Sequence, residues 1–175
     1  MNWKKVKETI VFKGWRSMLQ KTFELPNGKE ATFDIVETND FVSIVAFTKN
    51  KEAILVKQYR PGPEMQIVSF PEGAVEGKEA PEKTAARELL EETGYVAQKY
   101  ILLKVFRDAY RTEKQTCILA LDCEKVTTQK LDATEFIDVF LVPIEKLHSL
   151  LTNPTDESFT NVGAAYLALD YLKWL

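Results

Sequence analysis

The amino-acid sequence predicts an α+β fold in which a mixed β-sheet lies between helices. Three observations favour it: strand-like segments fill the first part of the chain, one helix-like segment interrupts them, and further strands precede two helices. Strands and helices that come in separate runs, rather than in strict alternation, are typical of this architecture. The chain has 175 residues, of which 45% are hydrophobic and 28% charged, enough for a substantial core.

Residues 1–38 are predicted to form an antiparallel β-hairpin extension ahead of the main domain, residues 39–175. Two strand-like segments, 15–25 and 30–37, flank the sequence Pro-Asn-Gly at 26–28, where Asn and Gly tolerate a positive φ. Trp15 and Phe33 would be core residues of this hairpin, as most aromatic side chains are. Stacking on a ligand is the alternative for both rings.

The elements of the main domain are predicted from apolar alternation, helical periodicity and turn residues. The predicted strands are 41–48, 53–59, 67–70, 100–106, 116–123 and 136–142. The predicted helices after the central one are 144–151 and 160–175, and the predicted loops are 107–115 and 153–158.

The central helix has residue types that suit both of its ends. Pro81 fits the first turn, where its missing N–H would have had no partner, and Gly94 fits the position just past the end. Residues 83–92 between them are mostly good helix formers. The sequence therefore predicts a helix that begins at Pro81 and ends before Gly94.

Three carboxylates share one face of this helix. Glu88, Glu91 and Glu92 have the spacing i, i+3, i+4, and two alanines and two leucines lie on the other side. Taken alone, such a face is most often simply solvated. Like charges at this spacing destabilise a helix, and a hard divalent cation such as Mg²⁺, which takes oxygen ligands, would neutralise them.

Charge and composition exclude several classes of function. A net charge of −3 gives no general attraction for nucleic acid, and the chain has no run of about 20 apolar residues that could span a membrane. Cys117 and Cys123 lack CxxC spacing, so we expect reduced, buried thiols and a cytoplasmic location. His148 is the single histidine, which argues against a zinc site or a Ser-His-Asp triad.

The spacing around the central helix matches Gly-x5-Glu-x7-Arg-Glu-U-x-Glu-Glu-x-Gly-U, where U is a bulky apolar residue. This pattern resembles the Nudix box, and the match is complete. The matching residues are Gly73, Glu79, Arg87, Glu88, Leu89, Glu91, Glu92, Gly94 and Tyr95. The resemblance implies the α/β/α sandwich of Nudix proteins.

The resemblance also implies an activity, namely hydrolysis of a nucleoside diphosphate linked to another moiety, with one to three Mg²⁺ or Mn²⁺ ions. By position in the box, Glu88, Glu91 and Glu92 would hold the metal together with the backbone carbonyl of Ala74. Glu79 and Arg87 would hold one another and orient that cluster.

Segments outside the box resemble the ADP-ribose pyrophosphatase and nucleoside diphosphate sugar hydrolase branch of the family. These are LVKQYR at 55–60, FPEGAVEGKE at 70–79 and LPNGK at 25–29. The branch is commonly a homodimer in which the N-terminal hairpin is exchanged between subunits. That implies stacking of Trp15, and more weakly Phe33, on adenine, and contact of Arg60 with the diphosphate. Glu135 would be the general base or orient the water, with Asp132 as the alternative.

Two departures from the branch concern the substrate. Residues 106–112 lack its proline, and residues 36–40 lack a basic residue that many relatives use. Arg107, Tyr110 and Arg111 could replace these contacts, or could belong to a solvated loop. The predicted substrate is ADP-ribose or a related nucleoside diphosphate sugar. The open alternatives are NADH or another dinucleotide, and a non-catalytic module that senses nucleotides.

Overall fold

The computed structural model describes residues 2–153 and 158–174. The chain forms two compact units. The first unit comprises Met1–Asp40 and Phe106–Gln115, and the second comprises Phe41–Val105 and Thr116–Leu175. Of the predicted loop 153–158, residues 154–157 lie outside the described residues.

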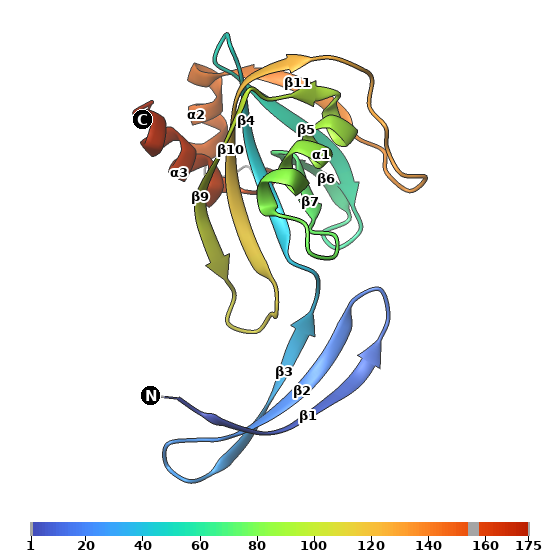
Figure 1. Ribbon diagram of the computed structural model, residues 1–175, viewed down its shortest axis with the longest axis vertical. Helices are drawn as coiled ribbons and strands as arrows, with labels where there is room; N and C mark the ends of the chain where they lie inside the picture. The colour runs from blue at the N-terminus through green and yellow to red at the C-terminus, as the bar shows by residue number, and fades with distance from the viewer. Residues whose placement is uncertain (1, 154–157, 175) are drawn as a thin grey trace. The chain divides into compact units, whose positions relative to one another are not determined.

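The first unit is built on a three-stranded antiparallel sheet in the order β1-β2-β3 (Figure 1). Its strands are β1 (Lys4–Lys13), β2 (Ser17–Glu24) and β3 (Glu30–Glu37). The predicted hairpin is confirmed as β2 and β3, with Gly28 at φ 76° in the turn. Strand β1 was not predicted, because its lysines and glutamate hide the alternation and every one of its residues is exposed.

Residues 107–115, predicted as a polar loop, pack with this sheet. The backbone of β3 pairs with the segment, since Val36 N–H donates to Tyr110 O at 3.0 Å and Thr112 N–H donates to Val36 O at 3.1 Å. Glu113, which is 1% exposed, accepts a hydrogen bond from the Thr38 hydroxyl at 2.9 Å. The segment is therefore an ordered part of the first unit.

The second unit contains a mixed sheet with the strand order β11-β5-β4-β10-β8, to which β6, β7 and β9 are added at β5, β4 and β10. Its strands are β4 (Phe41–Thr48), β5 (Glu52–Arg60), β6 (Met65–Ser69), β7 (Glu72–Ala74), β8 (Tyr95–Val96), β9 (Lys99–Arg107), β10 (Lys114–Lys125) and β11 (Asp138–Pro143). Its helices are α1 (Pro81–Thr93), α2 (Ile144–Thr152) and α3 (Val162–Leu172).

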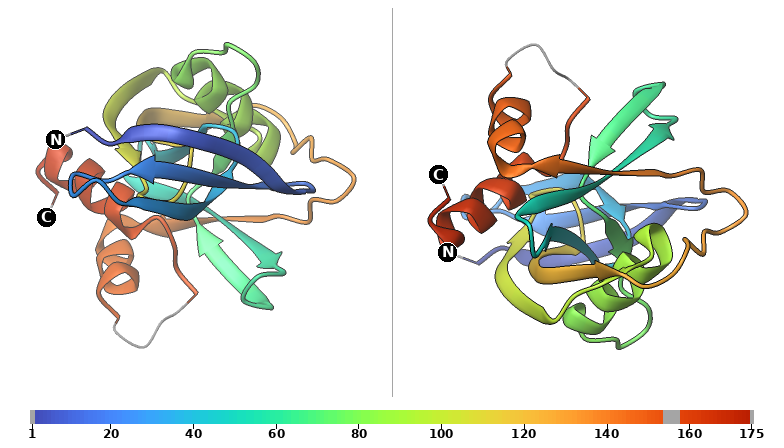
Figure 2. Two further views of the ribbon diagram at one scale, coloured as in Figure 1. Left: turned by 90° about the horizontal axis from the view of Figure 1, so that it is seen from below. Right: turned by 90° about the horizontal axis from the view of Figure 1, so that it is seen from above.

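The two faces of this sheet bury separate apolar clusters, so the predicted α/β/α sandwich is confirmed (Figure 2). On β4, Val45 and Phe47 point to the cluster that includes residues of α2 and α3. Ile44 and Ala46 point to the opposite cluster, which includes residues of α1. This alternation follows from the two-residue repeat of a strand and makes β4 the central strand of both cores.

Three local predictions have clear outcomes. Helix α1 begins at Pro81, and Gly94 caps it in the left-handed region at φ 76°. The predicted helix 160–175 was too long, because Asn161 (φ 59°) and Lys173 (φ 57°) are left-handed and bound α3 on both sides. Cys117 and Cys123 are buried free thiols, and burial raises the pKa of each to about 12. No helix in residues 2–153 and 158–174 is long and apolar enough to cross a membrane.

Candidate active site

Strand β7, which precedes α1 in the chain, approaches this helix so closely that it needs a glycine. Gly73 pairs with Val42 in the β7–β4 ladder and lies against the side chain of Glu88. A Cβ atom built on Gly73 would lie 1.8 Å from Glu88 Cδ, far inside van der Waals contact. The glycine of the box is therefore explained by this close approach of the backbone to a carboxylate.

Arg87 is the cation around which the oxygen atoms of the box gather. Its Nη1 donates to Glu88 Oε1 at 2.8 Å and to Glu91 Oε2 at 3.1 Å. Its Nη2 donates to the carbonyl of Ala74 at 3.0 Å and to Glu79 Oε2 at 3.3 Å. These neighbours raise the pKa of Arg87, with Glu88 the strongest, although burial alone would lower it. The predicted Glu79–Arg87 contact is present.

Glu92 is buried and forms no ion pair with any cationic side chain of residues 2–153 and 158–174. It is 5% exposed, and its Oε2 accepts a hydrogen bond from the Glu72 N–H at 3.1 Å. Burial raises the pKa of Glu92 to about 8 despite that hydrogen bond, and the charge of Glu88 adds to the rise. Burial also raises the pKa of Glu88, although Arg87 opposes the change. Helix α1 thus holds carboxylates whose negative charge is only partly met.

The donor set fits a hard divalent cation by its chemistry. All four predicted ligands are oxygen donors, and three of them (Glu88, Glu91 and the carbonyl of Ala74) already face a guanidinium cation. Among the described residues, however, no group of three or more acidic, cysteine or histidine side chains is arranged around one common metal position. The oxygen atoms are gathered on Arg87 instead.

A second network connects Arg60 to this helix through Glu72. Arg60 Nη2 donates to Glu72 Oε1 at 2.9 Å, and Asn161 Nδ2 donates to Glu72 Oε2 at 3.0 Å and to Ser43 Oγ at 3.1 Å. The Glu72 N–H in turn binds Glu92. Sequence reasoning missed Glu72 and Asn161. Glu72 lies directly before the glycine of the box, which is a usable signal, whereas nothing in the sequence marks Asn161.

Glu135 lies in the exposed loop between β10 and β11. Its Oε2 accepts the Asp132 N–H at 3.0 Å, and its own N–H donates to Asp132 O at 3.0 Å, so the two predicted candidates form one turn. The charge of Glu135 also contributes to the raised pKa of Glu88 and of Glu92, although burial and nearer groups have larger effects.

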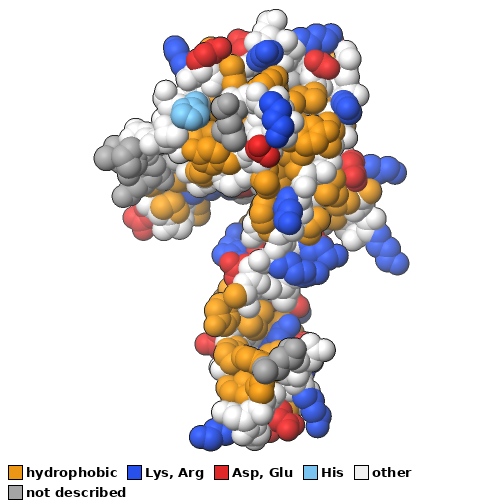
Figure 3. Space-filling model, turned by 90° about the vertical axis from the view of Figure 1, so that its left-hand side faces the viewer, with side chains coloured by type: hydrophobic (Ala, Val, Ile, Leu, Met, Phe, Trp, Pro, Cys, Tyr) orange, Lys and Arg blue, Asp and Glu red, His pale blue; other side chains and the backbone are white. Residues whose placement is uncertain are grey.

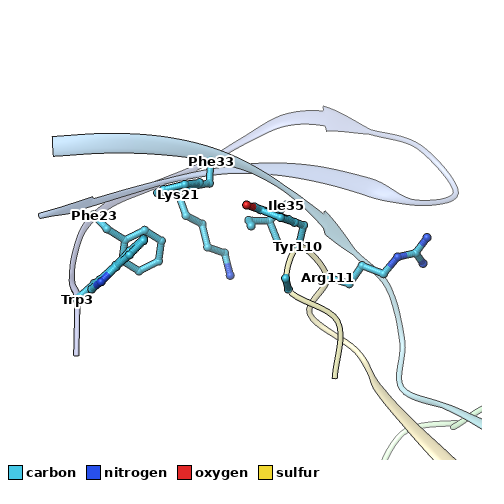
Figure 4. A pocket seen from close by; sticks show the side chains of 8 residues that line it. Trp3, Lys21, Phe23, Phe33, Ile35, Tyr110 and Arg111 are labelled. Atoms are coloured by element: carbon cyan, nitrogen blue, oxygen red, sulfur yellow. The ribbon is translucent and has the colours of Figure 1, made fainter. Parts of the chain in front are cut away.

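The remaining predicted substrate residues lie in the first unit. Phe33 lines a cleft of about 390 Å³, where its ring centroid is 5.6 Å from that of Trp3 and 6.5 Å from that of Tyr110 (Figure 4). Arg111 also lines this cleft, and its Nη1 donates to Glu113 Oε1 at 3.3 Å.

Trp15 is 94% exposed, so the prediction that it is a core residue of the hairpin was wrong. It lies in the turn between β1 and β2, where Arg16 is the residue that covers its ring, at 5.4 Å from the centroid. Hydrophobic side chains also gather elsewhere on the surface of the first unit (lower part of Figure 3), and the exposed ones include Val6, Ile10 and Phe12 of β1.

Comparison with known proteins decides the family. The model of the Nudix domain matches residues 38–161. The chain belongs to the Nudix hydrolase family. Its fold agrees, since a crystal structure titled as an ADP compounds hydrolase superposes with a TM-score of 0.85 over 99% of this chain and 96% of that one, at 24% sequence identity.

Two relatives of this Nudix hydrolase are similar over most of their length. An ADP-ribose pyrophosphatase of Bacillus subtilis is 38% identical over 153 residues, which are 86% of this chain and 80% of the relative. A methanol dehydrogenase activator of Bacillus methanolicus is 32% identical over 173 residues, which are 95% and 92% of the two chains. Nudix hydrolases generally use a divalent metal ion.

Proposed function

We propose that this Nudix hydrolase cleaves the diphosphate bond of ADP-ribose or a related nucleoside diphosphate sugar, giving a nucleoside monophosphate and a sugar phosphate. The observation that supports it best is the complete set of box oxygen donors on α1 and its preceding loop. The 38% identity to a relative named ADP-ribose pyrophosphatase supports the choice of substrate. A module that only senses nucleotides would not need so many incompletely neutralised carboxylates.

In this proposal the chain's own residues hold the metal and the water. Glu88, Glu91, Glu92 and the Ala74 carbonyl would bind Mg²⁺, or Mn²⁺ in its place. When bound, the ion supplies neutralisation of the phosphate charge and activation of the attacking water. Arg87, which already touches Glu79, keeps the glutamates oriented. Glu135, or Asp132 beside it, would accept the proton that the water loses as it attacks phosphorus.

Substrate contacts extend the proposal to four side chains. Arg60 would bind the diphosphate, because a guanidinium offers paired donors to phosphate oxygens. Phe33 would stack on the nucleobase, supported by its place in the aromatic cleft, and Arg111 at the same cleft would add positive charge. Trp15, which is 94% exposed, would stack on the nucleobase in the same way. The proposal also includes a cytoplasmic homodimer in which the first unit contributes to the interface.

Release of phosphate from a panel of nucleotides, after treatment with a coupled phosphatase, tests this function. The panel contains ADP-ribose, ADP-glucose, GDP-mannose, NADH, diadenosine polyphosphates and nucleoside triphosphates, each with Mg²⁺ and with EDTA. We expect metal-dependent turnover to be highest with ADP-ribose. Dominant turnover of NADH or a dinucleotide would keep the hydrolase and change its substrate. Binding of ADP-ribose without turnover of any compound would favour the sensing module.

A further inference from the structure

The segment that follows β10 runs along the C-terminal end of α1. The last carbonyl groups of a helix have no partner within the helix and need donors from elsewhere. Here the Val126 and Thr127 N–H groups donate to Gly94 O at 2.9 and 3.3 Å, and the Lys130 N–H donates to Glu91 O at 2.9 Å. A Cβ atom on Gly94 would lie 2.2 Å from Thr127 O, so the two segments are in close contact.

Gln129 adds a side chain to this contact. Its Nε2 donates to Glu92 O at 2.7 Å and to Ile137 O at 2.9 Å. Both partners are carbonyl oxygens, which accept hydrogen bonds, and the amide binds them with its two N–H groups. Gln129 is half-buried, whereas residues 124–128 and Lys130 are exposed, so its side chain is turned inward from a solvated segment.

These two hydrogen bonds close a loop. Gln129 lies directly before the loop 130–136 and Ile137 directly after it, so one amide group joins the two ends of the loop. The same group ties both ends to the backbone of Glu92. The loop contains Glu135, whose hydrogen bonds within the described part of the chain are those of the turn with Asp132. The position of Glu135 relative to α1 therefore depends on the backbone pairs at the start of the loop, on Gln129, and on the pairing of β11 with β5 that begins at Asp138.

We infer that Gln129 is a positioning residue that holds the Glu135 loop closed against the last turn of α1. This inference rests on the proposed function, since it matters for turnover only if Glu135 handles the attacking water. A displacement of about 1 Å in a group at the reacting centre can cost about 100-fold in rate. We accordingly expect loss of the Gln129 amide to lower kcat about 10- to 100-fold, with little change in KM.

The first experiment measures the loop without any substrate. Gln129→Leu keeps the size of the side chain and removes both donors. We expect the backbone amides of Lys130 and Glu135 to exchange hydrogen about tenfold faster or more, while the amides of β4 are unchanged. Gln98→Leu is the matched control, because Gln98 is exposed in the same unit and its side chain has no role in this loop. Unchanged exchange in Gln129→Leu would overturn the inference.

The second experiment is a double-mutant cycle on kcat with Gln129→Leu, Glu135→Gln and the double variant. If Gln129 acts through Glu135, its replacement lowers kcat in the wild-type background and causes no further loss when Glu135 is already replaced. A loss of equal size in both backgrounds would show a general structural role and overturn the inference. If Gln129→Leu does not fold, both measurements use Gln129→Asn, whose side chain is shorter by one methylene group. We then expect a smaller loss of kcat and a smaller increase in hydrogen exchange.

The outcomes separate this inference from the proposed function. If the wild-type protein hydrolyses no compound of the panel, the proposed function fails, and the exchange measurement still decides whether Gln129 holds the loop. If Glu135→Gln retains wild-type turnover, the positioning role in catalysis is wrong, while the metal-dependent hydrolase stands.

Discussion

Among the residues that the structure describes, each unit buries one glutamate almost completely, and the pKa values of the two carboxylates shift in opposite directions. Glu92 of the second unit is 5% exposed and Glu113 of the first unit is 1% exposed. The pKa of Glu92 rises to about 8, mainly because burial removes water from its charge. Burial also acts to raise the pKa of Glu113, but hydrogen bonds from its own N–H, from Thr38 and from Arg111 outweigh it, so that pKa is lowered.

The difference shows that the partners of a buried carboxylate, and not its burial alone, decide whether its pKa rises or falls. Glu113 has a hydroxyl donor at 2.9 Å and a guanidinium donor at 3.3 Å, so its negative charge is satisfied within the first unit. Glu92 has a single backbone donor and a neighbouring carboxylate. Carboxylates with strongly shifted pKa values cluster at functional sites, which supports the proposed metal-binding role of Glu92.

The largest expected effect comes from removing the charge of Glu92. Glu92→Gln keeps the shape and an acceptor for the Glu72 N–H, so we expect kcat with Mg²⁺ to fall by about 1,000-fold, as when a key electrostatic group is lost. Thermal stability without metal should be unchanged or higher, because the amide is neutral at every pH and suits this buried position. Turnover close to wild type would mean that Glu92 does not belong to the reacting site.

Gly73→Ala should have the next largest effect, because it displaces Glu88 without replacing any carboxylate. The new Cβ would meet Glu88 Cδ at 1.8 Å, so the carboxyl group has to move, and we expect kcat to fall about 10- to 100-fold. Gly163→Ala in α3 is the control, since nothing lies within 4 Å of its Cβ position. The control should keep full activity and gain up to about 1 kcal/mol of stability. Equal activity of the two variants would contradict the role assigned to Gly73.

Glu113 should affect stability and leave metal binding alone. Glu113→Ala leaves Thr38 and Arg111 without their acceptor, and we expect the free energy of unfolding in urea to fall by about 1–3 kcal/mol. Magnesium affinity, measured by calorimetry, should not change. A variant with wild-type stability would show that the hydrogen bonds of Glu113 add nothing to folding, and the contrast with Glu92 would then fail.

The smallest expected effect is a pH dependence that belongs to Glu113. Its pKa is lowered in the folded protein from an ordinary value of 4.5, so the unfolded chain binds the proton more readily. This contribution to stability is fully present above pH 4.5 and is lost as the pH falls through the folded-state pKa. Unfolding curves at several pH values should show a weaker loss in acid for Glu113→Gln than for wild type. Parallel curves for the two proteins would rule out this linkage.

Features with a local cause were predictable from the sequence. The limits of α1 follow from Pro81 and Gly94, and the shared face of the box glutamates follows from the helical repeat. The pairing of β2 with β3 follows from their turn residues.

Contacts between distant residues could not be predicted. Thr38 and Glu113 are separated by 75 positions, and no pattern near either residue indicates the hydrogen bond. No sequence pattern indicates the role of Gln129 either, because its hydrogen-bond partners are backbone carbonyl groups, which every residue has. Of the two predictions for Trp15, the core position rested on the usual burial of large rings and was wrong, since the ring is exposed.

The register of strand β4 affects both the packing of the two cores and the geometry of the candidate active site. The side chains of β4 alternate between the two cores. A register shift of one residue would therefore move the side chains of each core to the other face, where the space has a different shape. The same strand sets the register of β7, because Val42 is paired with Gly73. A shifted β4 would thus place a residue with a side chain opposite Glu88. Correct packing of both cores therefore also places Gly73 opposite Glu88.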